Sequence, residues 1–413
     1  MLKGVICCES MPKRHGSFIW HWHLPPQNCI MLCMSSEENL TDHPRARYIM
    51  IGGFLGAGKT TAVGRLAQHL SDQGLRVGLI TNDQGSGLVD TTMLRSRGFA
   101  TAEIPGGCFC CRFQSLVEAA EQLTHANTPD VFIAEPVGSC TDLVATVSYP
   151  LRRIYGDRFE IAPLSVLVDP TRAMRVLGLD EGRRFSEKVT YIYLKQLEEA
   201  DLMVINKIDS LEETQRKSLR TALEERFPTK KVLEVSARSG AGLEDWFALM
   251  TSEKQGSAET MEVDYEVYAE GEALLGWLNA TLELRSEEAW DGNAWMTQFA
   301  AHVQSQLEAQ HHEIAHLKMT LSPEDGLGDL AVINLIRNDF VPELSQTLPT
   351  NIQQAELIVN LRAEADPDAL EAALRSALDA MNAGQGAINA ALTHMEHFRP
   401  GKPEPTHRME ACP

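Results

Sequence analysis

Short apolar runs alternate with longer amphipathic segments along the first half of the chain. Strands of a parallel sheet are buried on both faces, so they appear as unbroken apolar runs with amphipathic helices between them. The expected strands are Tyr48–Gly52, Val77–Thr81, Val131–Ala134, Leu164–Val168, Leu202–Ile205 and Val232–Val235. This rhythm predicts an α/β domain over residues 45–250, in which helices flank a parallel sheet.

The pattern changes after residue 250. A polar stretch, residues 251–262, predicts a linker. Beyond it the expected elements are the helices Trp295–Ala309 and Pro367–Met381 and the strands His316–Leu321 and Glu356–Leu361. This mixture predicts a small α+β domain of ferredoxin-like type over residues 263–398.

Neither end of the chain shows a periodic pattern. Residues 1–44 hold four cysteines and a His-Trp-His run, and we expect a disordered tail there, with Met34 as an alternative first residue. Metal binding by Cys7, Cys8, Cys29 or Cys33 is the less favoured interpretation of this segment. Pro400, Pro403 and Pro405 cannot continue a helix, and they predict an extended tail over residues 399–413.

Composition excludes several classes of function. The chain has 413 residues, is 44% hydrophobic and 23% charged, and contains no apolar run long enough to cross a bilayer, so we expect no membrane partner. A net charge of −20 opposes nucleic-acid binding, which needs clustered lysine and arginine. Nine cysteines, an odd number, without a recognisable secretory signal favour the reducing cytoplasm over a disulfide scaffold.

A glycine-rich loop supplies the strongest chemical signal. Residues 53–60 read Gly-Phe-Leu-Gly-Ala-Gly-Lys-Thr and lie between an expected strand and an amphipathic segment, which matches GxxxxGK[ST] in its required context. The backbone N–H groups of such a loop form an anion nest at a helix N-terminus. We therefore predict a P-loop NTPase domain whose nucleotide contacts include Gly53, Gly56, Ala57, Gly58, Lys59, Thr60 and Thr61. Lys59 is expected to contact the β and γ phosphates and Thr60 to ligate Mg²⁺.

A second motif indicates guanine as the base. Asn206-Lys207-Ile208-Asp209 follows the strand Leu202–Ile205 and matches the NKxD element of GTPases. The Asp209 carboxylate can accept hydrogen bonds from both N1–H and the exocyclic amine of guanine, a pair of donors that adenine lacks. Ser236 and Ala237, after the next strand, are expected to reach the guanine oxygen. An ordinary turn is the competing interpretation of the Asn-Lys-x-Asp sequence.

Two acids are candidates for the magnesium and switch side of the site. Glu135 ends the run Val131–Ala134 and precedes Gly138 by three residues, the spacing of a switch. Asp83 follows the strand Val77–Thr81. We assign Glu135 to Mg²⁺ and the switch, and Asp83 to positioning the attacking water, although the reverse assignment is almost equally compatible. A helix cap or turn is the alternative role for Asp83.

Three thiols lie within four residues at Cys108, Cys110 and Cys111, after a Gly-Gly turn and before the amphipathic run Phe113–Leu123. Thiolates at this spacing suit Zn²⁺ or another borderline-soft divalent ion. Three protein ligands leave a fourth position open, which would allow the metal to be passed on. A redox pair or buried small residues are the alternatives. Cys140 could approach as a fourth thiol, but a role as a small buried residue is favoured.

Together these motifs resemble the CobW-type metallochaperone GTPases of the CobW/UreG/HypB class. The residues that carry the resemblance are GGFLGAGKTT at 52–61, GGCFCC at 106–111, AEPVG at 134–138 and NKID at 206–209. It implies that the Cys-x-Cys-Cys site binds a metal under nucleotide control. Two departures are Asn82-Asp83-Gln84-Gly85, where many relatives have Asn-Glu-Phe-Gly, and the lack of a His-rich run before the second domain. For His311, His312 and His316 a solvated face is favoured over an auxiliary metal site.

The leading hypothesis is therefore a cytoplasmic GTPase that hydrolyses GTP to GDP and phosphate and delivers Zn²⁺ or a similar ion. Its expected partner is a client metalloprotein, and a homodimer is possible. One alternative is a GTPase that guards an organic cofactor of a client enzyme, with structural cysteines. Another is a P-loop kinase for a small molecule, against which the guanine motif argues.

Overall fold

The computed structural model describes residues 45–410, apart from 83–88, 258, 325–327 and 385–387. The expectations for residues 1–44 and for Asp83 lie outside this range. None of the helices it describes is long and apolar enough to cross a membrane.

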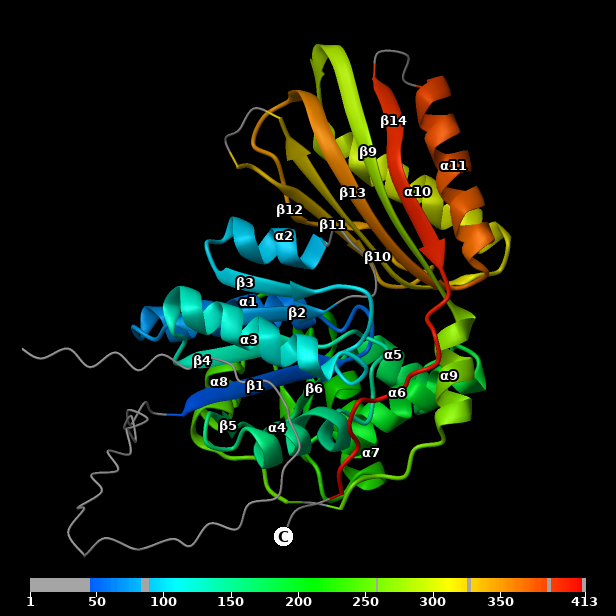
Figure 1. Ribbon diagram of the computed structural model, residues 1–413. Coiled ribbons are helices and arrows are strands. Elements are labelled where there is room, and N and C mark those ends of the chain that lie inside the picture. The colour runs from blue at the N-terminus through cyan, green and yellow to red at the C-terminus, as the bar shows by residue number, and fades with distance from the viewer. Residues whose placement is uncertain (1–44, 83–88, 258, 325–327, 385–387, 411–413) are drawn as a thin grey trace, which may run out of the picture. The chain divides into compact units, whose positions relative to one another are not determined.

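The first domain is built on a parallel sheet whose strand order is β3-β2-β4-β1-β6-β7-β8, with β5 paired beside β1 (Figure 1). Its strands are β1 (Ala46–Gly53), β2 (Val77–Asn82), β3 (Ala100–Ile104), β4 (Val131–Glu135), β5 (Phe159–Ile161), β6 (Ser165–Val168), β7 (Leu202–Ile205) and β8 (Lys231–Glu234). Its helices are α1 (Lys59–Asp72), α2 (Val89–Ser96), α3 (Phe113–Asn127), α4 (Tyr149–Ile154), α5 (Pro170–Val176), α6 (Glu187–Glu199), α7 (Glu213–Arg226) and α8 (Leu243–Ser252), with a short π-helix η1 (Val144–Ser148) and a short 3₁₀ helix η2 (Ile208–Ser210). The parallel α/β prediction is confirmed.

Both faces of this sheet are covered, because successive residues of β1 point into different cores. Tyr48 and Met50 belong to one apolar cluster, whereas Ile49 and Ile51 belong to another. This alternation explains why the strand is an unbroken apolar run in the sequence. The arrangement brings the carboxyl ends of the central strands to one edge, where ligands of such sheets bind.

The second domain is a six-stranded antiparallel sheet in the order β12-β11-β10-β13-β9-β14. Its elements are α9 (Tyr265–Leu274), β9 (Leu275–Trp290), α10 (Gly292–Ala309), β10 (Glu313–Pro323), β11 (Ala331–Leu335), β12 (Glu343–Gln346), β13 (Ile352–Glu364), α11 (Pro367–Gly384) and β14 (Asn389–Phe398). The strands β9, β10, β13 and β14 with the helices α10 and α11 form the ferredoxin-like βαββαβ pattern, which β11 and β12 extend. The prediction of an α+β second domain is confirmed.

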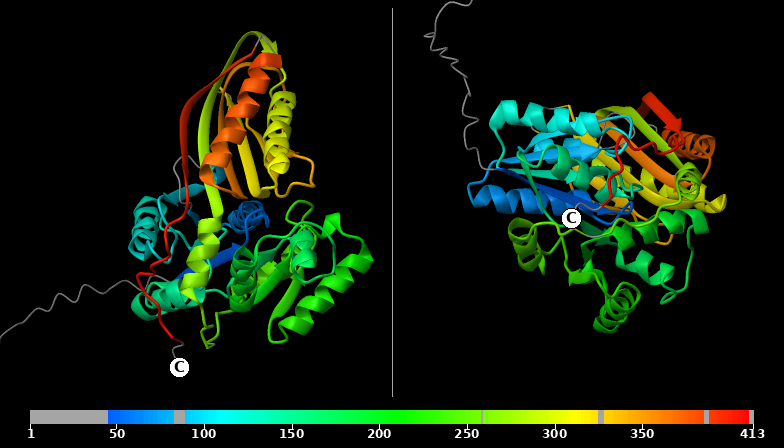
Figure 2. Two further views of the ribbon diagram at one scale, coloured as in Figure 1. Left: turned by 90° about the vertical axis from the view of Figure 1, so that its right-hand side faces the viewer. Right: turned by 60° about the horizontal axis from the view of Figure 1, so that its bottom comes forward.

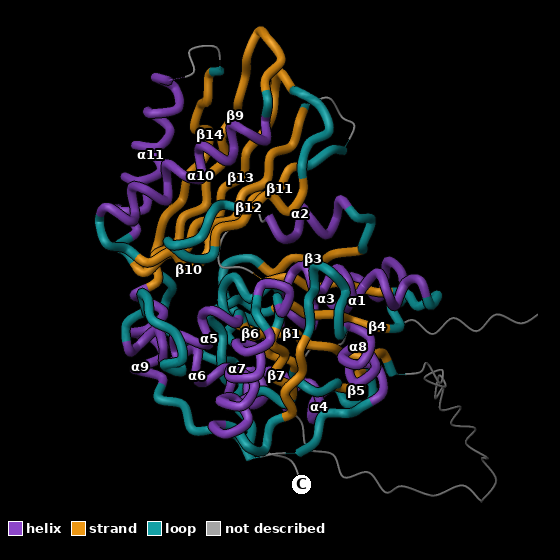
Figure 3. The backbone as a smooth tube through the Cα atoms, turned by 180° about the vertical axis from the view of Figure 1, so that it is seen from behind, coloured by secondary structure: helices purple, strands orange, loops and turns teal. Residues whose placement is uncertain are grey.

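The two faces of this second sheet differ in chemistry. Leu317, Met319 and Leu321 of β10 join the core that α10 and α11 cover (Figures 2 and 3). The alternate residues His316 and Lys318 line the cavity described below. Successive residues of β10 therefore alternate between the core face and the polar, cavity-lining face of the sheet.

Several strands of the structure are absent from the prediction. The largest is β9, whose 16 residues are fully buried at their start and exposed near their end. A strand that changes its surroundings along its length shows neither continuous apolar character nor strict alternation. Residues 399–410, after β14, form no helix or strand and run along the first domain (Figures 1 and 2).

Candidate functional site

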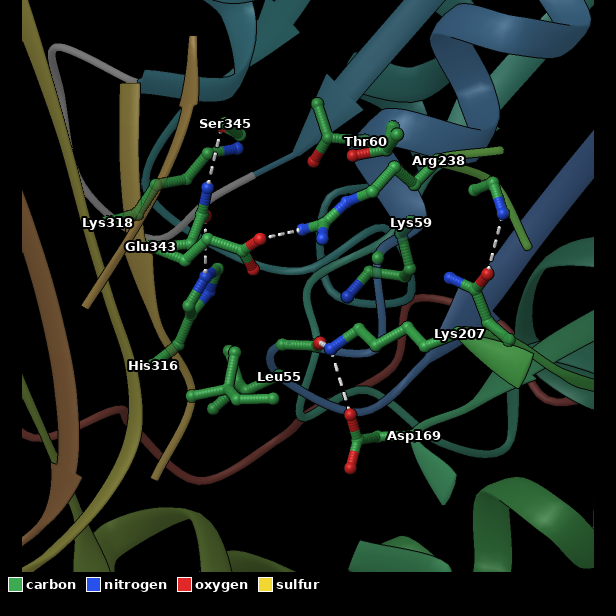
Figure 4. A pocket seen from close by; sticks show the side chains of 18 of the residues that line it. Leu55, Lys59, Thr60, Asp169, Lys207, Arg238, His316, Lys318, Glu343 and Ser345 are labelled. Carbon is green, nitrogen blue, oxygen red and sulfur yellow. Dashed lines mark hydrogen bonds and ion pairs between the residues drawn. The ribbon is translucent and has the colours of Figure 1, made fainter. Parts of the chain in front are cut away.

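A cavity of about 970 Å³ lies at the carboxyl ends of the central parallel strands (Figure 4). Of the residues predicted to bind nucleotide or magnesium, those that line it are Gly56, Gly58, Lys59, Thr60, Thr61, Glu135, Gly138, Asn206, Lys207, Asp209 and Ala237. Gly53, Ala57 and Ser236 do not line it. The Ala57 carbonyl and the Ser236 hydroxyl instead accept hydrogen bonds inside the fold, from Asn206 and from the Ser239 N–H.

The P-loop ends at Gly58, after which α1 begins. Gly58 has a φ of 95°, and a Cβ there would lie only 2.4 Å from Asn206 Nδ2. Only glycine meets both demands, since the left-handed backbone and the close approach each oppose a side chain. The loop therefore packs directly against the base-recognition motif. Lys59 is buried, with its Nζ 3.5 Å from the Phe54 carbonyl oxygen.

The switch segment contacts the same loop. Thr60 Oγ1 donates a hydrogen bond of 3.0 Å to Glu135 Oε1, and both side chains are buried. A Cβ on Gly138 would lie 2.8 Å from Leu55 Cδ2 and 3.0 Å from the Leu55 nitrogen. The segment of Glu135 and Gly138 therefore contacts the P-loop at two points, Leu55 and Thr60. The paired hydroxyl and carboxylate oxygens are the hard donors that Mg²⁺ requires.

Asn206 links the Asn-Lys-x-Asp motif to the P-loop and to the segment after β8. Its Nδ2 donates to the Ala57 carbonyl at 2.8 Å, and its Oδ1 accepts from the Ala237 N–H at 2.9 Å. Lys207, at a φ of 58°, places Nζ 2.7 Å from the Gly56 carbonyl oxygen. Asp209 follows on the 3₁₀ helix η2 and lines the cavity. The base motif and the P-loop thus form one hydrogen-bonded unit.

Asp169 lines the cavity and is absent from the residues that the sequence predicts. It follows β6, caps α5 by accepting from the Arg172 N–H, and forms an ion pair of 2.8 Å with Lys207. Burial alone would raise the pKa of this carboxyl, but the charges of Lys207 and Arg172 outweigh burial and lower it. An acid directly after a buried parallel strand is the signal that could have identified it.

The second domain supplies another wall of the cavity, which the sequence analysis also missed. A Cβ on Gly56 would lie 2.8 Å from Ile336 Cγ2, and Arg172 Nη2 donates to the Ile336 carbonyl at 2.7 Å. The polar residues of the second sheet that line the cavity include His316, Lys318, Asn334, Asn360 and Arg362. In Figure 4, His316, Lys318 and Glu343 face Lys59 and Thr60 across the opening, and Glu343 pairs with Arg238.

The three thiols of the cysteine loop converge between β3 and α3. Cys108 Sγ lies 2.8 Å from Cys110 Sγ and 3.1 Å from Cys111 Sγ. Hydrogen bonding with Cys110 and Cys111 lowers the pKa of the Cys108 thiol well below its ordinary value. The same contact with Cys108 raises the pKa of Cys111 to about 11. Cys108 and Cys110 are buried, whereas Cys111 is half-buried.

Asn82 connects this loop to the nucleotide cavity. Its Nδ2 donates to the Ile104 carbonyl at 2.9 Å and to the Gly107 carbonyl at 2.6 Å, directly before Cys108. The same residue ends β2 and lines the cavity. One side chain therefore touches both candidate sites.

The inner side of the thiol cluster is closed by residues from distant segments. Cys140, in the loop after the switch, is 1% exposed and belongs to the same apolar cluster as Cys108 and Cys110. Glu272 of α9 is 2% exposed and accepts a 2.6 Å hydrogen bond from Ser139 Oγ. Burial, followed by the nearby Cys108, raises the pKa of Glu272 well above its ordinary value.

The outer side of the cluster is covered by the C-terminal segment. The Glu404 N–H donates to Cys111 Sγ at 3.2 Å, and the Thr406 N–H donates to the Cys110 carbonyl at 2.9 Å. Two residues later, Arg408 Nε forms a 2.8 Å ion pair with the buried carboxylate of Asp142. The proline-rich tail that the sequence predicts to be extended is thus a wall of the thiol site.

Among the described residues, two groups have ligand atoms close enough to share a metal: the three cysteines, and Asp368 with Glu371 and His397. In the second group, His397 Nε2 lies 2.9 Å from Glu371 and its Nδ1 3.5 Å from Asp368, so each ring nitrogen faces a carboxylate. His311 and His312 belong to neither group.

Comparison with known proteins agrees with this geometry. A model of the CobW/HypB/UreG nucleotide-binding domain matches residues 47–234. The zinc chaperone CobW of a Sinorhizobium species is 29% identical over 212 residues, 46% of this chain and 58% of that protein. The zinc chaperone YeiR of Escherichia coli K12 is 29% identical over 163 residues, 39% of this chain and 46% of that protein. The chain thus spans about half the length of these relatives.

Among solved structures, the Zn(II)-bound YjiA GTPase from E. coli aligns with 81% of this chain and 99% of its own, at 12% identity and a TM-score of 0.33. The matched residues 47–234 include the P-loop, the cysteine loop, the switch glutamate and the guanine motif. This part of the chain belongs to the CobW/HypB/UreG family of nucleotide-binding domains.

Proposed function

We propose that the protein is a GTP-hydrolysing metallochaperone that binds Zn²⁺ or a similar divalent ion at Cys108, Cys110 and Cys111 and delivers it under nucleotide control. One observation carries this proposal. The loop that holds the three thiols is hydrogen-bonded, through Gly107, to Asn82, which lines the nucleotide cavity. Nucleotide state and metal affinity therefore share a physical connection.

The nucleotide part of the cycle rests on the P-loop. Lys59 would neutralise the β and γ phosphates, and Asp209 would select guanine through two hydrogen bonds. Thr60 would hold the Mg²⁺ that binds with the nucleotide, together with Glu135, directly or through water. The ion would neutralise negative charge on the phosphates. Glu135 would then respond to the γ-phosphate, because it accepts a hydrogen bond from Thr60 and because Gly138, three residues later, packs against Leu55.

The metal is cargo. Soft thiolate ligands favour Zn²⁺ and Cu⁺ over Mg²⁺. The cargo ion would therefore bind the three cysteines, and Mg²⁺ would bind the oxygen ligands Thr60 and Glu135. The relatives named zinc chaperones, CobW and YeiR, support Zn²⁺ as the ion. The recipient in this proposal is a client metalloprotein, in a cytoplasm that keeps the thiols reduced. A homodimer remains part of the proposal.

The test measures metal content and phosphate release on protein purified without an affinity tag. The proposal predicts one Zn²⁺ or similar ion per chain by mass spectrometry, and release of phosphate from GTP but not from ATP. Metal-free protein with reduced cysteines and active GTP hydrolysis would favour the cofactor-guarding alternative. Transfer of the γ-phosphate to a small molecule would favour the kinase alternative.

A further inference from the structure

The walls of the nucleotide cavity are positively charged, although the chain as a whole is acidic. The net charge of the protein is −20, whereas the described residues that line the cavity include eight lysine and arginine side chains and four carboxylates. Three of these cations belong to the second domain: Lys318, Arg337 and Arg362. An excess of positive charge in a concave site attracts an anion. The second domain therefore contributes charge, as well as surface, to an anion-binding cavity.

Lys318 occupies the middle of the polar face of the second sheet. It lies on β10 between Asn334 of β11 and Asn360 of β13, its partners in the two strand pairings. The residue is 6% exposed. Burial weakens the screening of its charge by water, so the ammonium group acts strongly on an anion bound in the cavity.

The other two cations are held within the second domain. The Arg362 guanidinium donates to two backbone carbonyls and lies 3.9 Å from the centre of the Trp277 ring. Arg337 Nε lies 3.0 Å from Asp339 Oδ1. The ammonium group of Lys318, a compact charge on a flexible stem, suits a phosphate ligand better than these two guanidinium groups.

Two contacts fix the strands around Lys318 against the first domain. A Cβ on Gly56 of the P-loop would lie 3.5 Å from the carbonyl oxygen of Ala315, three residues before Lys318 on β10. On the other side, the Val89 N–H at the start of α2 donates to Asn360 Oδ1 at 3.2 Å. Lys318 therefore lies between a strand that touches the P-loop and a strand that touches α2.

These contacts place Lys318 at the phosphate end of the cavity. Figure 4 shows Lys318 facing Lys59 and Thr60, the residues expected at the γ-phosphate and Mg²⁺. Glu343 of β12 pairs instead with Arg238, which directly follows the residues expected to reach the guanine. The polar face of the second sheet thus spans the cavity from base to phosphates.

We propose that Lys318 is a catalytic residue of GTP hydrolysis, which the second domain supplies to bind the γ-phosphate and stabilise the charge that develops on it. This inference rests on the proposed function and names a residue that sets its rate. The oxygen of a water molecule bonds to the γ phosphorus, the bond to the β–γ bridging oxygen breaks, and its electron pair stays on GDP. The proton that water loses goes to the released phosphate. Lys318 transfers no proton, because its part is electrostatic.

The first experiment measures phosphate release from GTP by the full chain with Mg²⁺. Lys318→Met keeps an unbranched side chain and removes the charge, so kcat should fall at least about 10-fold. GDP affinity should not change, because GDP lacks the γ-phosphate. Lys318→Arg restores a positive charge and should recover part of the lost rate.

The matched control is Arg285→Met, which removes an exposed cation from β9 of the same domain, away from the nucleotide cavity. It should keep the kcat of the unaltered protein. An unchanged kcat in Lys318→Met would overturn the inference. Equal weakening of GDP and GTP binding in that variant would also overturn it, because Lys318 would then support the fold and not the reaction.

The second experiment compares binding of GDP alone with binding of GDP and aluminium fluoride, which mimics the γ-phosphoryl group during transfer. Lys318→Met should lower the ratio of the two affinities at least about 10-fold. An unchanged ratio would reject the role of Lys318 alone. Absence of phosphate release by the unaltered protein would reject the proposed function, and a protein that binds neither GTP nor the mimic would reject both.

Discussion

The nucleotide cavity and the thiol site are built in different ways. Most of the cavity comes from short motifs, each directly after a parallel strand, which the sheet topology brings to one edge. The thiol site gathers a loop of the first domain, Glu272 of α9 and the C-terminal segment. A site at a sheet edge is therefore specified locally, whereas a site between segments depends on how distant parts of the chain pack.

The largest expected effect is on the nucleotide cavity and should leave the thiol site unchanged. Lys59→Ala should weaken GTP binding at least about 100-fold, because the cation that faces the phosphates is lost from a buried position. Zn²⁺ binding to the nucleotide-free protein should not change. Calorimetry measures both affinities.

The matched control for Lys59→Ala is Lys217→Ala, on the exposed surface of α7. It should leave GTP affinity unaltered. Equal GTP affinity in Lys59→Ala and the unaltered protein would mean that Lys59 of the P-loop does not bind the phosphates of GTP.

Asp209→Asn sharpens the comparison by changing only base selection. The variant should bind GTP about 10- to 100-fold more weakly, because two charge-assisted hydrogen bonds to guanine are lost. It should gain affinity for XTP, because the amide can donate to the oxygen that replaces the guanine amine. Competition between GTP and XTP measures the preference. Retained preference for GTP would show that another residue reads the base.

Arg408→Ala tests whether the C-terminal segment covers the thiol site. Loss of the ion pair with Asp142 should loosen the segment over Cys111 and let a chelator remove Zn²⁺ several-fold faster. Stopped-flow measurement with a chromogenic chelator gives the rate. Arg375→Ala removes an ion pair on the exposed side of α11 and serves as the control. Identical rates in the two variants would mean that the segment does not limit access.

The smallest expected effect concerns Glu199 of α6, which accepts hydrogen bonds from Thr141 and Val144 in the segment after the switch. Burial raises the pKa of Glu199 to about 8 from its ordinary 4.5. Between these two values the unfolded chain releases a proton that the folded protein keeps, so the contribution of Glu199 to stability is full below pH 4.5 and declines as pH rises. Glu199→Gln should gain stability relative to the unaltered protein as pH rises, by no more than about 1.4 kcal/mol per pH unit.

Urea denaturation at pH 5 and pH 8 measures this relative gain. Glu225→Gln, an exposed position of α7, is the control and should show no such trend. A constant difference between Glu199→Gln and the unaltered protein would mean that Glu199 is already ionised in the folded state.

The contrast between the sites also explains what the sequence could predict. Gly58 and Asn206 could be assigned to the nucleotide site because each belongs to a motif with a fixed place after a strand. Asp169 follows the same rule but has no extended motif around it. Ile336 of the second domain could not be placed against Gly56, since their contact depends on domain packing.

At the thiol site, the loop cysteines were found because thiols at that spacing are unusual. For Cys140 the sequence favours a buried small residue, and the structure has this side chain 1% exposed. No pattern in the sequence indicates a role for Glu272 or Thr406. Their roles arise from the packing of α9 and of the C-terminal segment on the cysteine loop.

The central claim is that metal and nucleotide are coupled, and a pair of titrations tests it most directly. Zn²⁺ affinity is measured with GDP and with a nonhydrolysable GTP analogue, and GTP-analogue affinity with and without Zn²⁺. We predict a change of about 5- to 150-fold, equal in both directions because binding linkage is reciprocal. The triple variant Cys108→Ser, Cys110→Ser and Cys111→Ser should lose Zn²⁺ and the coupling while keeping metal-free GTP binding. Equal Zn²⁺ affinity in the two nucleotide states would contradict the account.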